Sequence, residues 1–310
     1  WINLFILKKL NSYKMNELAK TYFEKGSALD RKSEFKKAIE DYNEAISLDP
    51  NYAAAFNNRG NCYRELNEYK LAIEDFSQAI RLNPNYADAF NKRGLCYYLL
   101  NHYIKSIEDY SQSLSREPYN DAVYHIRGLC YYALKEYQQA IEDYTEAINL
   151  NPNLVDAFYN RGVCKTELKN HQQAIEDYSQ AIRLNTNDAA AFINRGKCYK
   201  DLKKYNQAIE DYTLGINLNP NYPIAFNNRG NCYSIINNYQ QAIEDYSTAI
   251  KLDPNYGDAY LNRGMGYIEL QNFPKALADF NTALNIDKTS IRAYVARANL
   301  FELLGQFNHD

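Results

Sequence analysis

Long apolar runs and an excess of charge of one sign are both missing from this sequence. No run of about twenty apolar residues occurs, so no segment is expected to span a membrane. The 35 Lys and Arg residues stand against 38 Asp and Glu residues, which leaves a net charge of −3. Without a basic excess the chain lacks the electrostatic attraction that nucleic-acid binding requires, so we expect no nucleic-acid partner.

Residues that commonly support catalysis or bind metals are also few or poorly spaced. The chain has 4 His residues and no Cys-x-x-Cys pair. No Ser/His/Asp set, phosphate-binding loop or metal-ligand spacing stands out. We therefore expect no enzymatic activity, no metal and no cofactor.

What the sequence does contain is a strict internal repeat. The dipeptide Arg-Gly returns every 34 residues, at Arg59-Gly60, Arg93-Gly94, Arg127-Gly128, Arg161-Gly162, Arg195-Gly196, Arg229-Gly230 and Arg263-Gly264. A fixed period of this length is typical of stacked arrays of small supersecondary units. Full units run over 19–52, 53–86, 87–120, 121–154, 155–188, 189–222, 223–256 and 257–290. Residues 1–18 do not fit the period, and 291–310 begin an incomplete ninth unit.

Each unit has the apolar spacing of two helices, and not the alternation of a strand. In the unit 53–86 the two helices are expected on either side of Asn67-Glu68. Asn tolerates the left-handed backbone that such a turn needs. The segment Asn83-Pro84-Asn85 is expected to end the second helix, because Pro disfavours a helical residue before it.

Small and aromatic residues recur at fixed places in the units. The fourth place is aromatic: Tyr22, Phe56, Phe90, Tyr124, Phe158, Phe192, Phe226, Tyr260 and Tyr294. The eighth holds the Gly series, and Ala recurs in the second helix at Ala38, Ala72, Ala140, Ala174, Ala208, Ala242 and Ala276. The sequence thus resembles the tetratricopeptide repeat family. That resemblance implies an all-α fold, a right-handed α-solenoid of eight repeats plus a terminal helix, and a role in binding proteins or peptides.

The six cysteines share one place in the repeat, two residues after the Gly: Cys62, Cys96, Cys130, Cys164, Cys198 and Cys232. Ala28 and Gly266 hold the same place in other units, so the position favours a small side chain. We predict buried, unpaired thiols that serve packing, against the alternatives of disulfides or metal ligands. Free thiols suit a reducing compartment, and we expect an intracellular, cytoplasmic location.

The Arg of each Arg-Gly pair has two possible roles. It could face an acidic ligand, or it could pair with an Asp that every second helix carries: Asp41, Asp75, Asp109, Asp143, Asp177, Asp211, Asp245 and Asp279. We favour the internal pair, because a buried row of unpaired Arg would be costly. We also expect that removing Asp143 costs more stability than removing Arg127.

The residue before that Arg is often Asn: Asn58, Asn160, Asn194, Asn228 and Asn262, with Lys92 and Ile126 as interruptions. This series resembles the asparagine ladder of two family members, the O-linked N-acetylglucosamine transferase array and the peroxisomal targeting-signal receptor. The resemblance implies amides that hold the backbone of an extended peptide in a concave groove. An amide offers a donor and an acceptor, so it can satisfy a peptide group whatever its side chain. The alternative is that Asn is simply abundant in this chain.

By the same resemblance, apolar and aromatic residues line the groove beside the ladder: Leu95, Tyr98, His125, Leu129, Tyr132 and Tyr159. Apolar groups on a face that meets water indicate a binding or self-association surface. The alternative is a rotated helix that buries them.

Two functions remain at this stage. The first is a non-enzymatic scaffold that binds an extended peptide or a partner helix, with self-association possible. The second is the repeat half of a larger enzyme or assembly whose active domain is not in this chain. Residues 1–14 could be a capping helix, a signal remnant or upstream sequence, and we expect the natural protein to continue beyond Asp310.

Overall fold

A computed structural model describes the backbone of residues 2–307 and the side chains of residues 13–305. The described residues form helices and no strands, as predicted. The helices are α1 (Ile2–Asp30), α2 (Phe35–Leu48), α3 (Ala53–Glu65), α4 (Tyr69–Leu82), α5 (Ala87–Leu99), α6 (Tyr103–Leu114), α7 (Asp121–Ala133), α8 (Tyr137–Leu150), α9 (Val155–Glu167), α10 (His171–Leu184), α11 (Ala189–Asp201), α12 (Tyr205–Leu218), α13 (Pro223–Ile235), α14 (Tyr239–Leu252), α15 (Gly257–Glu269), α16 (Phe273–Ile286) and α17 (Ile291–Phe307).

The turn inside each repeat is made by one residue with a left-handed backbone. The prediction for Asn67 is confirmed, since its φ is 61°. The equivalent residues are Ser33, Asn101, Lys135, Lys169, Lys203, Asn237 and Gln271, all with positive φ. A left-handed residue after a helix redirects the chain so that the next helix runs back beside it. The sequence pattern thereby fixes a helix-turn-helix unit.

The second helix of a repeat stops before the proline, as expected. Helix α4 ends at Leu82 and helix α8 at Leu150, so no helix crosses Pro84 or Pro152. Helix α6 departs from the pattern: it ends at Leu114, and Ser115 at its end keeps a helical backbone.

Helix α1 is longer than the other first helices because it continues upstream of the repeat. It begins at Ile2 and runs without a break through residue 18, where the repeat numbering starts. The side chains of residues 1–12, in the segment that the sequence left open as a cap, signal remnant or upstream sequence, lie outside the described part of the chain.

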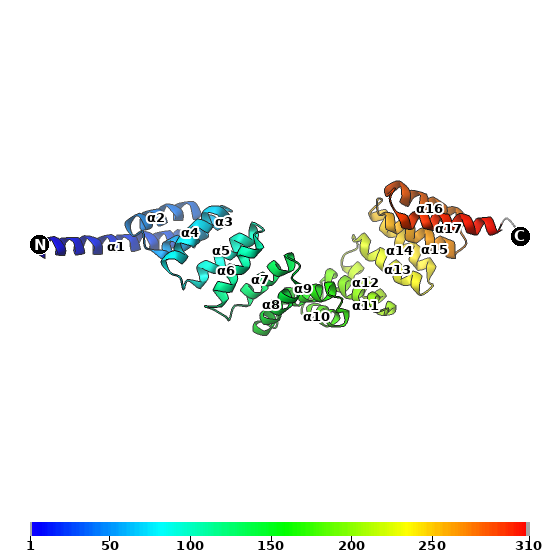
Figure 1. Cartoon of the computed structure of the whole chain (residues 1–310), viewed down its shortest axis with the longest axis horizontal. Coiled ribbons are helices and arrows are strands. Elements are labelled where there is room, and N and C mark those ends of the chain that lie inside the picture. Colours follow the sequence, from blue (N-terminus) through cyan, green and yellow to red (C-terminus); the bar gives the residue numbers. More distant parts are fainter. Residues whose placement is uncertain (1, 308–310) are drawn as a thin grey trace. The chain divides into compact units, whose positions relative to one another are not determined.

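Above the level of the 34-residue repeat, the chain divides into two compact parts that each hold several repeats. From here on we call them unit 1 (Trp1–Ala157) and unit 2 (Phe158–Asp310). Within each unit a helix packs against the helices before and after it along the chain (Figure 1). The core is therefore a series of small clusters, such as Ala38, Tyr42 and Cys62 in unit 1.

Close approach of paired helices depends on Gly in the first helix and an aromatic ring in the second. A Cβ added to Gly60 would lie 3.0 Å from a ring carbon of Phe76. The ring of Phe76 is fully buried, as is that of Tyr144. The recurring Gly thus leaves room for the ring that fills the space between the helices.

The six cysteines are free and buried, which confirms the prediction. Burial raises the pKa of Cys96 and of Cys164 to about 12. Two thiols also touch a hydroxyl: Cys130 Sγ lies 3.3 Å from Ser106 Oγ, and Cys198 Sγ lies 3.3 Å from Thr166 Oγ1. These cysteines are packing groups and, with a raised pKa, weak nucleophiles.

Candidate functional site

The Arg residues of the Arg-Gly pairs form internal ion pairs with the Asp residues of the second helices. Arg127 donates from Nε to Asp143 Oδ2 (2.8 Å) and from Nη2 to Asp143 Oδ1 (2.6 Å). The guanidinium also lies 5.6 Å from the centre of the Tyr124 ring. Burial raises the pKa of Asp143, while the hydrogen bonds and charge of Arg127 act to lower it. The predicted internal pairing is confirmed.

The same ion pair recurs through the chain at N–O distances of 2.6–2.8 Å. It joins Arg59 to Asp75, Arg93 to Asp109, Arg127 to Asp143, Arg161 to Asp177, Arg195 to Asp211, Arg229 to Asp245 and Arg263 to Asp279. In the first repeat Lys25 takes the place of Arg and lies 3.1 Å from Asp41.

A further contact, which the sequence reasoning missed, joins this row to the second helix of the preceding repeat; it is made by Arg59, Arg93, Arg127, Arg195, Arg229, Arg263 and, in the last helix, Arg297. Arg127 Nη1 donates to Ser111 Oγ at 2.9 Å, and Arg93 Nη1 donates to Ser77 Oγ at 2.9 Å. In these seven contacts the acceptor lies 16 residues before the Arg, where Ser, Thr or Asn stands. This 16-residue spacing is the feature of the sequence that could have predicted the contact. One guanidinium thus joins two repeats.

The asparagine ladder lies on the first helices, at α3, α9, α11, α13 and α15. Its members Asn58, Asn160, Asn194, Asn228 and Asn262 are all half-buried. Two of them are held by the preceding repeat. Asn194 Nδ2 donates to Tyr159 Oη at 2.9 Å, and Asn262 Nδ2 donates to Asn227 Oδ1 at 3.0 Å.

The acceptors of those bonds come from the place just before the ladder in the preceding repeat. Tyr159 had been assigned to the groove for its apolar ring, which lies 5.9 Å from that of Tyr178. Asn227 was not singled out from the sequence and is 5% exposed. The feature of the sequence that could have predicted these bonds is the spacing of 35 residues between donor and acceptor. A bond of this kind fixes the side-chain rotamer of the ladder amide before any ligand arrives.

Unit 1 is different, because the ladder is interrupted there. Lys92 Nζ donates to Asp88 Oδ2 at 2.7 Å, and the same oxygen accepts from Asn57 Nδ2 at 3.0 Å. Ile126, the other interruption, packs against the buried cluster that includes Tyr110 and Cys130. At these two positions the side chain makes contacts within the protein, and the ladder has no amide there.

The candidate apolar residues of unit 1 are partly buried, so they form neither a fully free surface nor a fully buried core. Leu95 and Tyr98 pack against the cluster around Tyr110 and are half-buried. Leu129 is also half-buried, whereas Tyr132 is 39% exposed. Each Tyr ring is supported by a second Tyr, since Tyr98 lies 6.0 Å from Tyr103, centre to centre. Part of each side chain therefore stays available to a ligand.

His125 is half-buried, and its ring lies 5.7 Å from that of Tyr144. Burial lowers the pKa of His125, while the charges of Asp156 and Asp121 act in the opposite direction. The imidazole is therefore neutral at pH 7 and belongs with the apolar neighbours.

Two hollows in unit 2 adjoin ladder residues. One, of about 400 Å³, is lined by Tyr159, Ile193, Asn194 and Tyr222 among others. The second, of about 480 Å³, is lined by residues of α11, α12, α13, α14, α15 and α17. Its lining includes Lys200, Asn227, Asn231, Asn262, Met265 and Arg292. Both offer amides beside apolar side chains.

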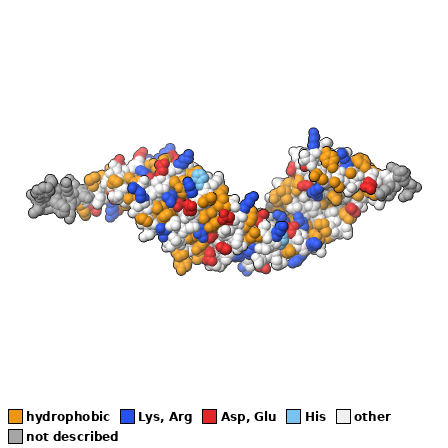
Figure 2. Space-filling model, in the orientation of Figure 1, with side chains coloured by type: hydrophobic (Ala, Val, Ile, Leu, Met, Phe, Trp, Pro, Cys, Tyr) orange, Lys and Arg blue, Asp and Glu red, His pale blue; other side chains and the backbone are white. Residues whose placement is uncertain are grey.

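Other classes of site receive no support from the part of the chain that can be placed. No three His, Cys, Asp or Glu side chains among the described residues come together as metal ligands would. None of the described helices is both long and apolar enough to cross a lipid bilayer. On the face shown in Figure 2, positive and negative side chains are interspersed and hydrophobic ones reach the surface between them.

The fold and the repeat length place the chain in a family. Models described as tetratricopeptide repeat match residues 53–86, 87–120, 155–188, 189–222, 223–256 and 257–290. A further model, described as TPR repeat, matches residues 19–63 and 128–164. The chain therefore belongs to the tetratricopeptide repeat family, whose fold is generally a non-catalytic scaffold for protein interactions. No curated protein matches it.

Solved structures with the same fold have low sequence identity. The chain is similar to YrrB, a tetratricopeptide protein with an unusual peptide-binding site, with 20% identity over 61% of this chain and 97% of that one and a TM-score of 0.55. It is also similar to a tetratricopeptide repeat protein from Parabacteroides merdae, with 18% identity over 80% of this chain and 98% of the other and a TM-score of 0.56. MamA matches at 24% identity over 52% of this chain and 94% of its own, with a TM-score of 0.51. These likenesses establish the solenoid fold, whereas the handedness and the count of eight repeats stay predictions.

Proposed function

We propose that the chain is a non-enzymatic interaction scaffold whose first helices bind an extended peptide or a partner helix. The main support is that two ladder amides in unit 2 are fixed by hydrogen bonds to the preceding repeat. Asn194 donates to Tyr159, and Asn262 donates to Asn227. The repeat scaffold supports the two ends of each bond, so the amides need little reorganisation when a ligand binds. The resemblance to the asparagine ladders of other family members points to the same use.

The amides retain hydrogen-bonding capacity after those internal bonds. The NH₂ group of Asn194 has two hydrogens and uses one on Tyr159, while Oδ1 remains an acceptor. Asn262 is in the same situation. Each can therefore pair with both the N–H and the C=O of a peptide backbone. Such contacts set the position of the ligand more than its affinity, because they replace hydrogen bonds to water.

In unit 1 the affinity is proposed to come from the apolar residues Leu95, Tyr98, His125, Leu129 and Tyr132. The two Tyr rings are held from behind by other Tyr rings, at 6.0 Å for Tyr98 and 5.8 Å for Tyr132. Rigid, half-exposed aromatic side chains are typical of residues that dominate binding energy. Hydrophobic contact here and amide contact in unit 2 are separate contributions.

The test uses peptides selected from a randomised display library on the whole chain. Tyr132→Ala should weaken the selected peptide by about 1–3 kcal/mol, and Asn228→Ala by about 0.5–1.5 kcal/mol. Asn217→Ala, at an exposed position of the second helix α12, is the control and should change nothing. Isothermal titration measures all three.

Two results would count against this proposal. If Asn194→Ala combined with Asn228→Ala leaves binding intact, the ladder takes no part. If Tyr132→Ala also leaves it intact, the first helices are not the binding surface, and the ligand must lie elsewhere on the chain.

A further inference from the structure

Unit 1 carries a row of small hollows on its turns, away from the ladder and the apolar residues above. They are lined by residues 33–37 with Leu66, by residues 67–71 with Leu100, and by residues 101–105 with Leu134. Their volumes are about 280, 300 and 370 Å³. The three sets are related by the 34-residue repeat, so the hollows recur once per repeat. We call them the turn row.

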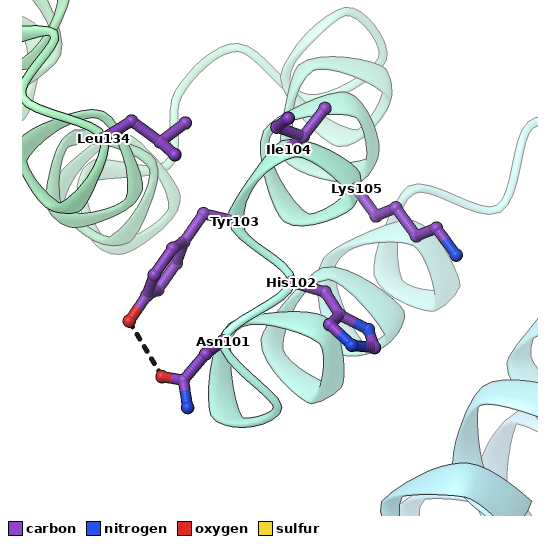
Figure 3. A pocket seen from close by; sticks show the side chains of 6 residues that line it. All are labelled: Asn101, His102, Tyr103, Ile104, Lys105 and Leu134. Carbon is purple, nitrogen blue, oxygen red and sulfur yellow. Dashed lines mark hydrogen bonds between the residues drawn. The ribbon is translucent and has the colours of Figure 1, made fainter.

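Each hollow is built from an aromatic ring and a leucine of the next repeat. Figure 3 shows the third, where the Tyr103 ring lies below Leu134 and its hydroxyl reaches Asn101, while His102 and Lys105 point away from Leu134. The rings of Phe35, Tyr69 and Tyr103 pack against buried clusters on their inner side. The outer part of each ring forms the wall of a hollow that is already shaped without a ligand.

The two tyrosines are fixed further by the left-handed residue of their own turn. Tyr69 Oη donates to Asn67 Oδ1 at 2.6 Å, and Tyr103 Oη donates to Asn101 Oδ1 at 2.8 Å. Those bonds use the amide oxygens and leave the NH₂ groups exposed. Among the described residues, Asn67 Nδ2 and Asn101 Nδ2 donate to no protein group. Each turn therefore presents hydrogen-bond donors beside an apolar hollow.

Positive charge borders the first two hollows. Lys36 and Lys70 stand where Ile104 stands in the third, and both are exposed. Neither forms an ion pair with any residue that the structure places. Glu34 is neutralised by Lys37, at 2.6 Å, which leaves Glu68 as the acidic residue of the row. The row is thus complementary to a ligand with carbonyl and carboxylate oxygens.

The donors of the row select the conformation of its ligand. The amide NH₂ groups of Asn67 and Asn101 need free acceptors on that ligand. A polyproline II segment has no internal hydrogen bonds, so its backbone carbonyls are free to accept. An α-helix bonds its carbonyls internally and would leave the row's donors unused.

We propose that the turn row binds an acidic, proline-rich segment of a partner protein in the polyproline II conformation. Apolar residues of the segment enter the hollows against Phe35, Tyr69 and Tyr103. The free carbonyls between them accept from Asn67 and Asn101, and acidic side chains pair with Lys36 and Lys70. This surface is additional to the proposed function of the first helices and shares no residue with it.

The experiment titrates the whole chain into a fluorescein-labelled peptide of about twelve residues built from Leu-Pro-Glu triplets, read by fluorescence anisotropy. Saturable binding should weaken at least about fivefold with Lys70→Glu, which reverses a charge at the rim. It should weaken about tenfold with Asn67→Gly plus Asn101→Gly, which remove the donors and keep the left-handed turns.

Two matched variants separate a binding effect from a folding effect. Asn237→Gly removes the same Tyr–Asn hydrogen bond, Tyr239 Oη to Asn237 Oδ1 at 2.8 Å, from a turn in unit 2. Lys251→Glu makes the same charge change on an exposed lysine of unit 2. Both should leave the anisotropy curve unchanged, and circular dichroism should find all variants equally helical.

Several results would overturn the proposal. One is the absence of saturable binding, and another is equal binding of a peptide made of Leu-Pro-Lys triplets. A third is an affinity that changes neither with Lys70→Glu nor with the double Asn variant. Tighter binding of a helical peptide with leucines at heptad spacing would show that the occupant is a helix. Asn194→Ala with Asn228→Ala should not affect this titration, so the two proposals succeed or fail independently.

Discussion

The Arg127–Asp143 pair shows what the recurring Arg-Gly dipeptide does. Arg127 has three hydrogen-bond contacts, two with Asp143 and one with Ser111 of the preceding repeat. Its side chain is 17% exposed, whereas that of Asp143 is 6% exposed. The carboxylate is thus the more deeply buried partner. The pair connects two helices of one repeat, and the Ser contact connects neighbouring repeats.

The structure favours the opposite order of mutational cost from the one expected from the sequence. Asp143→Ala leaves Arg127 with Ser111, the Tyr124 ring and partial contact with water. Arg127→Leu leaves a buried carboxylate without its charged donor. We expect Arg127→Leu to lower the free energy of unfolding by about 3–5 kcal/mol, and Asp143→Ala by less. Urea denaturation followed by circular dichroism measures both.

The two variants should also differ in their response to pH. Burial raises the pKa of Asp143 even when Arg127 is present, and without Arg127 the rise is larger. A carboxyl whose pKa is higher in the folded state stabilises the fold at low pH, and this stability is lost as pH rises through the folded pKa. The cost of Arg127→Leu should therefore shrink as pH falls from neutral towards the raised pKa. Equal costs of the two variants at every pH would contradict this account.

At the scale of the helix, the repeated Gly decides how closely the two helices of a repeat approach. A Cβ added to Gly264 in α15 would lie 2.6 Å from a ring carbon of Phe280 in α16. Gly257 stands at the start of the same helix, and its added Cβ would meet nothing closer than 3.6 Å. Two glycines in one helix thus have different roles.

Substitution of these two glycines by Ala should change stability in opposite directions. Gly264→Ala forces the helices apart or tilts the Phe280 ring, and should cost about 1–3 kcal/mol. Gly257→Ala should stabilise by about 0.5–1 kcal/mol, because Ala loses less backbone entropy in a helix. Thermal denaturation of the two variants checks the signs. A loss of stability in both would mean that backbone geometry, and not the Phe280 contact, sets the cost.

The elements themselves followed closely from the sequence, because each repeat is defined by local rules. The turn at Asn67, the ends before Pro84 and Pro152 and the buried cysteines were all predicted from period and residue type. Side-chain partners across repeats were harder, since Asn227 and Ser111 matter only when a residue from another helix reaches them. The partial exposure of Tyr98 could not be predicted from the sequence for the same reason, because it depends on how Tyr103 packs.

At the scale of the whole molecule, contacts are local in the sequence. The principal helix contacts within each unit join elements that are adjacent or next but one along the chain. Stability in such arrays is close to a sum of repeat terms and nearest-neighbour terms, so parts of the chain can open while others stay folded. The six buried cysteines, one per repeat from 53–86 to 223–256, are natural reporters of this opening.

Thiol labelling in increasing urea should therefore expose the cysteines in groups and not all at once. In the native state labelling should be slow at every site, because each thiol is buried and burial raises the pKa of Cys62 to about 12 and that of Cys232 to about 11. As urea weakens the interfaces between repeats, Cys62, Cys96 and Cys130 in unit 1 should become reactive at urea concentrations different from those for Cys164, Cys198 and Cys232 in unit 2. Mass spectrometry of labelled peptides gives the rate at each site. A single rate with one urea dependence for all six would mean that the array opens as one cooperative body, and local contact alone would then not describe its folding.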